Sequence, residues 1–418
     1  MRQRSAMPHA PVHRQKLPGI AEAVDEVLKR ARPVDAERAP LDQCLGRILR
    51  EDVPVPFDMP PFDRSAMDGY ALAGETTDGM YSLVACIAAG ESDLPTLRAG
   101  ECSRIFTGAP IPPGANRVAI QEECLVKGRH VQVTKAIPPG GNIRRQGEDA
   151  HTGDVALPIG LLIDVPQIGI AASLGCSHLA VSRRPCAWIL STGNELVEPG
   201  RKLKPGQIYN SNGPQLAAQF ASFGAHARTT GILGDHPGRI LAQVEDAIER
   251  GADILCISGG ASVGDADFTR SALEQGGFTV HFHGVDLKPG KPSLFATRGK
   301  TLAFGIPGNP VSHLAVFALL IAPAIHAQLG LPPRPKHVAR MKKTWKGKID
   351  ARDRWLPACV QQEGGLVSVE FLPWKGSGNL VSCRTANAVG NIPANTISLA
   401  KGADVAYAPL SGGNFGIG

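Results

Sequence analysis

The residue types best suited to chemistry lie at 258–269, which reads SGGASVGDADFT. An apolar run at 252–257 precedes this stretch and a helical pattern follows it, so we place it between a buried strand and a helix. Its three glycines let the backbone approach an anion, and free N–H groups can bind one. Asp265 and Asp267 would repel that anion unless a cation lay between them. Capping of the following helix explains one of these aspartates but not both.

Other polar stretches follow the neighbouring predicted strands, in the sequences STGNE, GDHP, LKPGKP and PGNPVS. The carboxyl ends of parallel strands meet at one edge of a sheet, and ligands of open α/β sheets bind there. Carboxylates that hold Mg²⁺ through oxygen, beside lysines that meet phosphate charge, are typical of a metal–phosphate site. Asp235 could instead only cap a helix, and the lysines could lie in a solvated turn. The residues expected to converge on this cleft are Glu195, Asp235, Asp265, Asp267, Lys288 and Lys291.

Two other kinds of site fit less well. The stretch 284–292 is only superficially like a phosphate-binding loop of nucleotide hydrolases, because five residues instead of four separate Gly284 from Gly290 and Pro292 replaces the hydroxyl residue. His281 and His283 share one face of a predicted strand, but a zinc site needs a third ligand that the sequence does not offer nearby.

Between residues 185 and 330, strands alternate with helices of ordinary length, which predicts a parallel sheet covered on both faces. The predicted strands are 187–191, 227–233, 252–257, 279–282 and 301–306. The predicted helices are 214–223, 237–250, 268–275 and 311–329.

The remaining chain predicts a multi-domain α/β and β fold around this central α/β domain. Residues 19–31 have helical periodicity, and a second helix is expected around 41–49. Short strands broken by Gly and Pro at about 70–143 predict a β insert within an N-terminal α/β region. The expected parts are a disordered tail at 1–16, the N-terminal region at 17–181, the α/β domain at 182–330 and a C-terminal β domain at 331–418.

Composition excludes several classes of function. The 418 residues carry 44 basic and 38 acidic side chains, a net charge of +6 that is too diffuse for a nucleic-acid footprint. Nine cysteines without a C-x-x-C pair argue against a disulfide framework and fit a cytoplasmic protein. The longest apolar run, at 314–325, is too short to span a bilayer, and the N-terminus lacks a secretory signal. We therefore expect no nucleic-acid or membrane partner.

Two stretches of the N-terminal region also carry candidate site residues. Asp68 lies in FDRSAMDGYA, where Asp68–Gly69 could be merely a turn. Arg144 and Arg145 lie in NIRRQGED, where paired arginines suit bidentate recognition of an anion. The alternative for this second stretch is a solvated charged loop.

With these motifs in place, the chain closely resembles the MoeA-type molybdopterin molybdenumtransferases, the family that includes the gephyrin E domain. The motifs FDRSAMDGYA, TGAPIP, NIRRQGED, STGNEL, GQIYNSN, SGGASVGDADFT, LKPGKP, PGNPVS and the GSG loop occur in the family's order. Each is weak alone, but together they are specific and cover nearly the whole chain beyond its N-terminal tail.

The resemblance implies a transferase of molybdenum cofactor biosynthesis that inserts molybdate into adenylylated molybdopterin, with Mg²⁺ dependence and release of AMP. It identifies the central α/β domain as the molybdopterin-binding domain. It also implies a homodimer whose site lies at the subunit interface.

Motif by motif, the resemblance implies site residues in three groups. The catalytic residues would be Asp68, Thr107, Asp149, Glu195, Asp267 and Lys288. The substrate-binding residues would be Ser258, Gly259, Gly260, Ser262, Lys291, Pro307, Asn309 and Ser377. The metal ligands would be Asp235, Asp267 and Glu195.

Some positions depart from the family pattern. Asn194 and Asn210 stand where many members have Asp, and Gly284 stands where the family usually has a second lysine. Lys291, Arg144 or Arg145 could supply the missing positive charge.

Two other functions stay open at this level. One is adenylyl transfer to molybdopterin, although that branch usually carries a TGGTG-type loop where this chain has SGGASVG. The other is a non-catalytic molybdopterin-binding scaffold.

Overall fold

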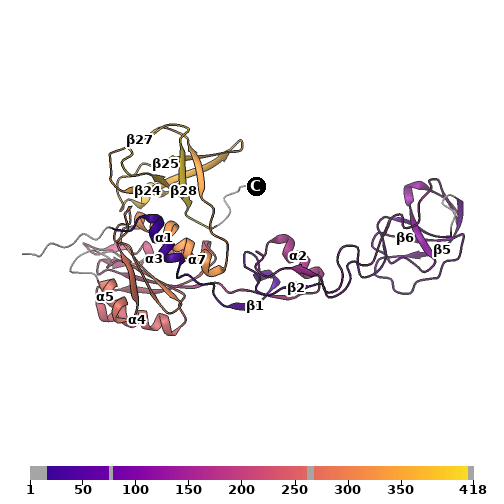
Figure 1. Cartoon of the computed structure of the whole chain (residues 1–418), viewed down its shortest axis with the longest axis horizontal. Coiled ribbons are helices and arrows are strands. Elements are labelled where there is room, and N and C mark those ends of the chain that lie inside the picture. Colours follow the sequence, from indigo (N-terminus) through magenta and orange to yellow (C-terminus); the bar gives the residue numbers. More distant parts are fainter. Residues whose placement is uncertain (1–16, 75–78, 261–267, 413–418) are drawn as a thin grey trace, which may run out of the picture. The chain divides into compact units, whose positions relative to one another are not determined.

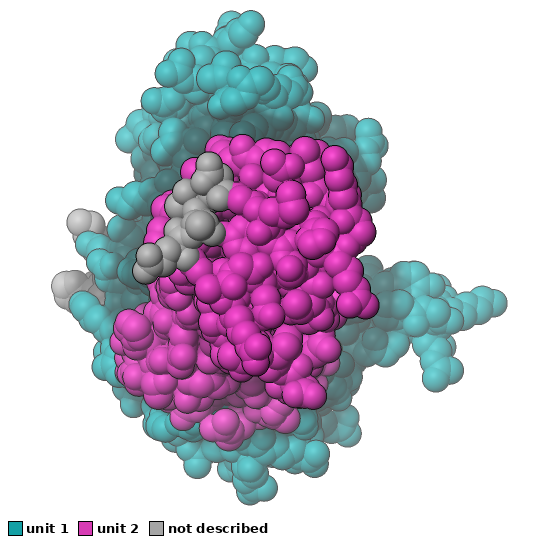
Figure 2. All heavy atoms as spheres, turned by 90° about the vertical axis from the view of Figure 1, so that its right-hand side faces the viewer, with its two compact units in different colours: residues 1–37, 46–48, 182–418 teal, residues 38–45, 49–181 magenta. Residues whose placement is uncertain are grey.

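The computed structural model describes residues 17–74, 79–260 and 268–412. The chain forms two compact units, coloured teal and magenta in Figure 2. Unit 1 contains the described residues up to Glu37, residues 46–48 and the chain from Ser182 onward. Unit 2 contains Arg38–Leu45 and Leu49–Val181.

A six-stranded sheet forms the centre of unit 1. Its order is β16(His226–Leu233), β13(Cys186–Thr192), β17(Ile254–Ser258), β21(Thr301–Ile306), β20(Leu294–Arg298) and β18(Thr279–His283). The first four strands are parallel, as expected. Strand β20 was not predicted and runs antiparallel to both neighbours, so the sheet is mixed.

Helices cover both faces of this sheet (Figure 1). Because side chains alternate along a strand, Ile254 and Cys256 pack on one face and Leu255 and Ile257 on the other. The first face is covered by α1(Ile20–Leu28), α3(Asn212–Ser222) and the run α6(Pro310–Val316), η3(Phe317–Ile321) and α7(Ala322–Leu329). The second is covered by α4(Pro237–Glu249) and α5(Phe268–Gln275). The α/β architecture is therefore confirmed.

The helical run Pro310–Leu329 is long and apolar enough to cross a membrane by length and composition alone. However, 78% of its apolar window is buried inside the protein, where Val316, Phe317 and Leu320 join the core. It is the central core helix of this unit.

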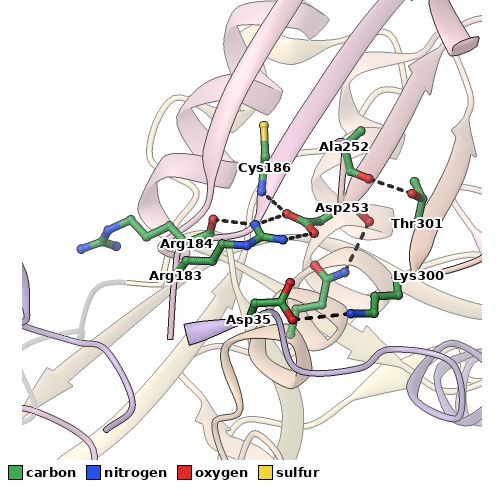
Figure 3. Close-up of polar contacts among 9 residues, drawn as sticks. Asp35, Arg183, Arg184, Cys186, Ala252, Asp253, Lys300 and Thr301 are labelled. Atoms are coloured by element: carbon green, nitrogen blue, oxygen red, sulfur yellow. Dashed lines mark hydrogen bonds and ion pairs between the residues drawn. The ribbon is translucent and has the colours of Figure 1, made fainter. Parts of the chain in front are cut away.

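A polar cluster holds the amino-terminal ends of these strands (Figure 3). Asp253, just before β17, accepts two hydrogen bonds of 2.6 Å from the Arg183 guanidinium and one of 2.7 Å from the Cys186 amide. The Thr301 hydroxyl donates to the Ala252 carbonyl at 2.7 Å. These bonds join the starts of β13, β17 and β21, so the polar sequences at the other strand ends lie on the opposite edge.

The C-terminal part of unit 1 is a small β-barrel. Its strand order is β24(Asp353–Glu363), β25(Leu366–Phe371), β22(His337–Met341), β28(Asp404–Pro409) and β26(Ala388–Ile392), and β26 pairs back with β24. This closure leaves no free edge among the five strands. Strand β19(Leu287–Lys288) of the LKPGKP motif adds to β24.

Unit 2 contains the expected β insert. Its six-stranded sheet has the order β7(Ala115–Ile120), β4(Gly69–Ala73), β6(Glu101–Ile105), β5(Gly79–Ile87), β9(His130–Val133) and β8(Cys124–Lys127). The rest of the unit packs around α2(Val165–Ser173), with ladders β2(Val53–Pro54)–β11(Val155–Leu157) and β3(Arg64–Ser65)–β10(Ile143–Arg144).

The prediction of a helix around 41–49 is wrong. Only the 3₁₀ turn η1(Leu41–Gln43) forms, because Gly46 has φ +74° and Leu49 pairs with Val181 instead. The remaining short elements are β1(Ala36–Pro40), η2(Gln121–Glu123), β12(His178–Ser182), β14(Leu196–Val197), β15(Ile208–Tyr209), β23(Trp345–Lys346), η4(Leu380–Cys383) and β27(Ser398–Leu399).

Candidate functional site

A cavity of about 610 Å³ opens at the carboxyl ends of β13, β17 and β21 in unit 1. Its wall includes five of the predicted substrate-binding residues and one predicted catalytic acid. These are Ser258, Gly259, Gly260, Pro307, Asn309 and Glu195. Two further predicted site residues, Ser262 and Asp267, lie outside the described residues, as does Asp265.

The two glycines after Ser258 are required by the backbone. Gly259 has φ +98° and Gly260 has φ +62°, values that favour glycine. A Cβ on Gly259 would lie 2.4 Å from the carbonyl oxygen of Thr192. The chain can therefore turn tightly from β17 into the cavity wall, as expected for a backbone that approaches a phosphate.

Ser258 lies in a buried hydrogen-bond network at the cavity wall. Asn212 Nδ2 lies 3.1 Å from Ser258 Oγ and 2.8 Å from the Gly308 carbonyl oxygen. His313 Nε2 lies 3.3 Å from Ser258 Oγ and 2.6 Å from the Pro307 carbonyl oxygen. Burial lowers the pKa of His313 to about 4, so its imidazole is neutral near pH 7.

The two described candidate metal ligands lie just after the ends of adjacent strands. Glu195 follows β13 and lines the cavity, while Asp235 follows β16 and is not part of the lining. The Asn194 amide donates to Asp235 Oδ2 at 3.3 Å, and the Asp235 amide donates to Asn194 Oδ1 at 3.2 Å. Within the described ranges, no three His, Cys, Asp or Glu side chains gather closely enough to hold a metal ion.

Asn210, the other departure from the family pattern, has a structural partner. Its side-chain oxygen accepts a 3.0 Å hydrogen bond from the Gly213 amide in the first turn of α3. An amide oxygen caps a helix as a carboxylate does. This interaction explains why Asn is accepted at position 210.

Ser377 is held next to the cavity through its backbone. The Val311 amide, in the first turn of α6, donates to the Ser377 carbonyl oxygen at 3.0 Å. The neighbouring Gly378 and Leu380 line the cavity, opposite Asn309 at the start of the same helix. The GSG sequence, in which Gly376 and Ser377 are half-buried and Gly378 is exposed, is thereby fixed at the cavity rim.

Lys288 lies elsewhere in unit 1. Its ammonium group pairs with Asp350 at 2.6 Å and lines a different cavity, of about 600 Å³, in the barrel. Burial raises the pKa of Asp350, but hydrogen bonds from Lys288 and the Arg352 amide outweigh this and hold it below its usual range. Lys288 and Glu195 therefore line separate cavities in the described structure.

Lys291 is exposed, and its side chain makes no hydrogen bond or ion pair with any described residue. Its neighbour Pro292 lines the 610 Å³ cavity. Lys291 therefore directly precedes a residue of the cavity wall and has no carboxylate partner in the part of the chain that the structure describes.

Gly284 lines a third cavity, beside α1, and is absent from the wall that contains Ser258. It has φ +104°, and a Cβ there would lie 2.8 Å from Leu17 Cδ2. The backbone itself therefore disfavours a lysine at this position. His281 and His283 also line this third cavity, where the described His, Cys, Asp and Glu side chains form no group of three that could hold a metal ion.

Three predicted site residues belong to unit 2. The Thr107 amide and hydroxyl both donate to Asp68 Oδ1, at 2.7 and 2.8 Å. Asp149 instead pairs with Arg144, which also bonds Glu148. No hydrogen bond or ion pair joins Asp149 to the Asp68–Thr107 pair among the described residues.

The paired arginines of this unit both have carboxylate partners. Arg144 contacts Glu148 and Asp149, and Arg145 pairs with Asp63 at 2.5 Å. The solvated charged loop considered as the alternative therefore describes these two side chains better than a free anion clamp.

Sequence reasoning did not single out three residues of these sites. Asn212 lies within the motif GQIYNSN and His313 directly follows PGNPVS, so proximity to a motif was the available signal. Asp350 lies in no motif, and its pairing with Lys288 could not be predicted because the two residues are 62 positions apart in the sequence.

Three family models match successive parts of the chain. The MoeA N-terminal region (domain I and II) matches residues 19–175, a probable molybdopterin binding domain matches 188–327, and the MoeA C-terminal region (domain IV) matches 339–410.

Full-length relatives agree with these matches. Molybdopterin molybdenumtransferase 2 of Mycobacterium tuberculosis is 33% identical over 393 residues, covering 91% of this chain and 95% of that protein. Molybdopterin molybdenumtransferase of Nostoc sp. is 33% identical over 386 residues, covering 89% of this chain and 88% of that protein. The crystal structure of a molybdopterin biosynthesis MoeA protein from Pyrococcus horikosii superposes with a TM-score of 0.79 at 32% identity, covering 95% of this chain and 100% of that one. The chain therefore belongs to the MoeA family of molybdopterin molybdenumtransferases, which are enzymes of molybdenum cofactor biosynthesis.

Proposed function

We propose that the protein inserts molybdate into the dithiolene of adenylylated molybdopterin, depends on Mg²⁺ and releases AMP. The observation that carries this proposal is the cavity at the ends of β13, β17 and β21. Its wall combines the glycine backbone after Ser258, which suits a phosphate, with the carboxylate of Glu195, which suits a cation. Ser258, Gly259, Gly260, Pro307 and Asn309 bind the substrate in this proposal.

The reaction brings like charges together. Molybdate carries two negative charges, and each phosphoryl group of the pyrophosphate linkage in adenylylated molybdopterin carries one. At about 4 Å and an effective dielectric constant of about 20, each pair of unit charges costs about 4 kcal/mol, or about 8 kcal/mol in all. Lys291, exposed beside the cavity, supplies part of the positive charge that offsets this repulsion. Lys288 contributes only when its ammonium group leaves Asp350.

Mg²⁺ would be held by oxygen ligands. Mg²⁺ is usually bound through one or two carboxylates together with phosphate oxygens and water. Glu195 and Asp235, which follow adjacent strands, fit this donor set, and a hydrogen bond from the Asn194 amide holds the Asp235 carboxylate. Asp267 completes the proposed ligands. When bound, the ion would neutralise phosphate charge and polarise a phosphoryl oxygen.

The residues Asp68, Thr107 and Asp149 reach the site from a second subunit in this proposal. They belong to unit 2, whereas the cavity is built entirely by unit 1. A homodimer would allow unit 2 of one subunit to complete the cavity of its partner, with Ser377 at the rim. The enzyme is proposed to act in the cytoplasm, in accord with its nine free cysteines.

An AMP-release assay tests the reaction. Purified protein with adenylylated molybdopterin should release AMP only when molybdate and Mg²⁺ are both present. Glu195→Gln should abolish the release, whereas Glu198→Gln, which removes the same charge outside the cavity wall, should leave it unchanged. Release of AMP without molybdate, or full activity of Glu195→Gln, would refute the proposal.

Complementation between subunits tests the shared site. Asp68→Ala and Glu195→Ala homodimers should each be inactive. Mixed dimers made by co-refolding or co-expression should regain activity, because one of their two sites contains neither change. Failure to regain activity in verified mixed dimers would place Asp68 outside the partner's site.

A further inference from the structure

The hydroxyl of Ser258 is unusual because it is surrounded by donors. Ser258 ends β17, is 1% exposed and still forms part of the cavity wall. Its Oγ has two described neighbours at hydrogen-bond distance, Asn212 Nδ2 and His313 Nε2. The directions of these two bonds decide where the hydroxyl proton can go.

The Pro307 carbonyl fixes the tautomer of His313. A carbonyl oxygen can only accept, so His313 Nε2, which lies 2.6 Å from it, must carry a hydrogen. A protonated Nε2 has no lone pair with which to accept a hydrogen bond from Ser258. The same N–H therefore also acts as the donor in the 3.3 Å contact between His313 Nε2 and Ser258 Oγ.

Asn212 acts on the other side of Ser258. Its Nδ2 must be the donor, because it also lies 2.8 Å from the carbonyl oxygen of Gly308. Asn212 is only 8% exposed, and its side chain lines the same cavity. Both contacts of Ser258 Oγ are therefore accepted bonds, and its proton has no acceptor among the described residues.

We propose that His313 and Asn212 are positioning residues that hold the Ser258 hydroxyl as a donor to a phosphate oxygen of molybdopterin. This inference rests on the proposed placement of the substrate in this cavity. A phosphate oxygen is a pure acceptor, which matches a hydroxyl whose only free role is to donate. The positive-φ backbone of Gly259 and Gly260 begins directly after this hydroxyl, so the phosphate can approach it closely.

Two substitutions at His313 separate positioning from packing. His313→Leu keeps the bulk of the side chain but removes the N–H, and His313→Gln restores an N–H at a similar distance from the backbone. We expect His313→Leu to weaken equilibrium binding of molybdopterin by roughly tenfold to a hundredfold, as for loss of a hydrogen bond to a charged group. His313→Gln should recover most of this loss, whereas equal loss in both variants would overturn the proposal.

A double-mutant cycle with Ser258→Ala tests whether His313 acts through Ser258. If it does, adding His313→Leu to Ser258→Ala should weaken binding no further, because the hydroxyl that it positions is already gone. Additive losses would show that His313 acts independently and would overturn the inference. If His313→Leu does not fold, as judged by thermal unfolding, Asn212→Leu takes its place in the same cycle, because it removes the donor at nearly the same shape without adding a charge.

The phosphate itself is tested with dephosphorylated molybdopterin. Its affinity should be the same for wild-type protein and Ser258→Ala, whereas a remaining dependence on Ser258 would mean that another atom accepts the bond. These readouts are binding affinities and do not require AMP release. If the two substitutions have additive effects on binding in an enzyme that releases AMP, only this inference is refuted. If they are non-additive as expected but the protein releases no AMP, only the proposed reaction is refuted.

Discussion

Thr107 donates two hydrogen bonds to a single oxygen of Asp68, one from its amide at 2.7 Å and one from its hydroxyl at 2.8 Å. Both bonds favour the ionised carboxylate, so they lower the pKa of Asp68, the amide having the larger effect and the hydroxyl the next. The pair spans 39 residues of sequence and joins two motifs, FDRSAMDGYA and TGAPIP.

Thr107→Val should raise the pKa of Asp68. The substitution removes the hydroxyl donor and keeps the amide, so protonation of Asp68 should begin at a higher pH. If ionised Asp68 is required for AMP release, the acid-side fall of the rate should move to higher pH. Thr107→Ser keeps the hydroxyl and should follow the wild-type profile; identical profiles for all three proteins would contradict the assignment.

Asp253→Ala should destabilise unit 1 without weakening molybdopterin binding. The change leaves the Arg183 guanidinium and the Cys186 amide without their partner, at the end of β17 away from the cavity. Breaking a buried pair costs about 3–5 kcal/mol, and because 30% of Arg183 is exposed we expect about 2–3 kcal/mol in denaturant unfolding.

The control for Asp253 is Asp246→Ala, which breaks an exposed pair with Arg250 within α4. This change should cost at most about 0.5 kcal/mol. Equal losses in the two variants would show that burial of the Asp253 pair does not matter. A large loss of affinity in a folded Asp253→Ala protein would contradict its purely structural role.

Gly284→Lys should not restore a useful positive charge. Gly284 has φ +104° and a Cβ there would contact Leu17, so we expect a loss of at least about 1–2 kcal/mol of stability from backbone strain. AMP release should not rise, because residue 284 is outside the wall that contains Ser258. Gly299→Lys is the matched control: its φ is +58° but the space around it is open, so it should lose less stability. A faster rate in Gly284→Lys would contradict this placement.

His313 should make folding stability depend on pH. Burial lowers its pKa from 6.5 to about 4 in the folded state, so the unfolded chain binds more protons between these values. Stability is therefore full above about pH 6.5 and falls as the pH drops toward the folded pKa. The contribution of His313 should amount to about 2 kcal/mol between about pH 7.5 and about pH 5.

The comparison with His313→Gln isolates this contribution. The variant has no titrating group at position 313, so its unfolding free energy should fall less than that of the wild-type protein on acidification. Other histidines contribute equally to both proteins and cancel in the difference. Parallel pH curves for the two proteins would mean that His313 is not held neutral by burial.

Local sequence determined most of the secondary structure and the identity of the binding motifs. Hydrophobic periodicity placed α1, and the alternation of strands with helices predicted α4, α5 and the α/β domain around β17. The same reasoning missed β20 and predicted a helix at 41–49 where only the 3₁₀ turn η1 forms. Both depend on pairing with distant strands, which local sequence does not report. The polar sequence SGG was placed correctly at the end of a buried strand, where all three of its residues line a cavity.

Only the tertiary structure decided which side chains meet. Lys288 was expected beside Glu195, but β19 adds to the barrel strand β24 and its ammonium group pairs with Asp350. Asn212 and His313 have no pattern of their own, yet they converge on Ser258 from 46 and 55 residues away. Sequence periodicity reports which face of an element is buried, whereas a hydrogen-bond partner depends on how distant elements pack.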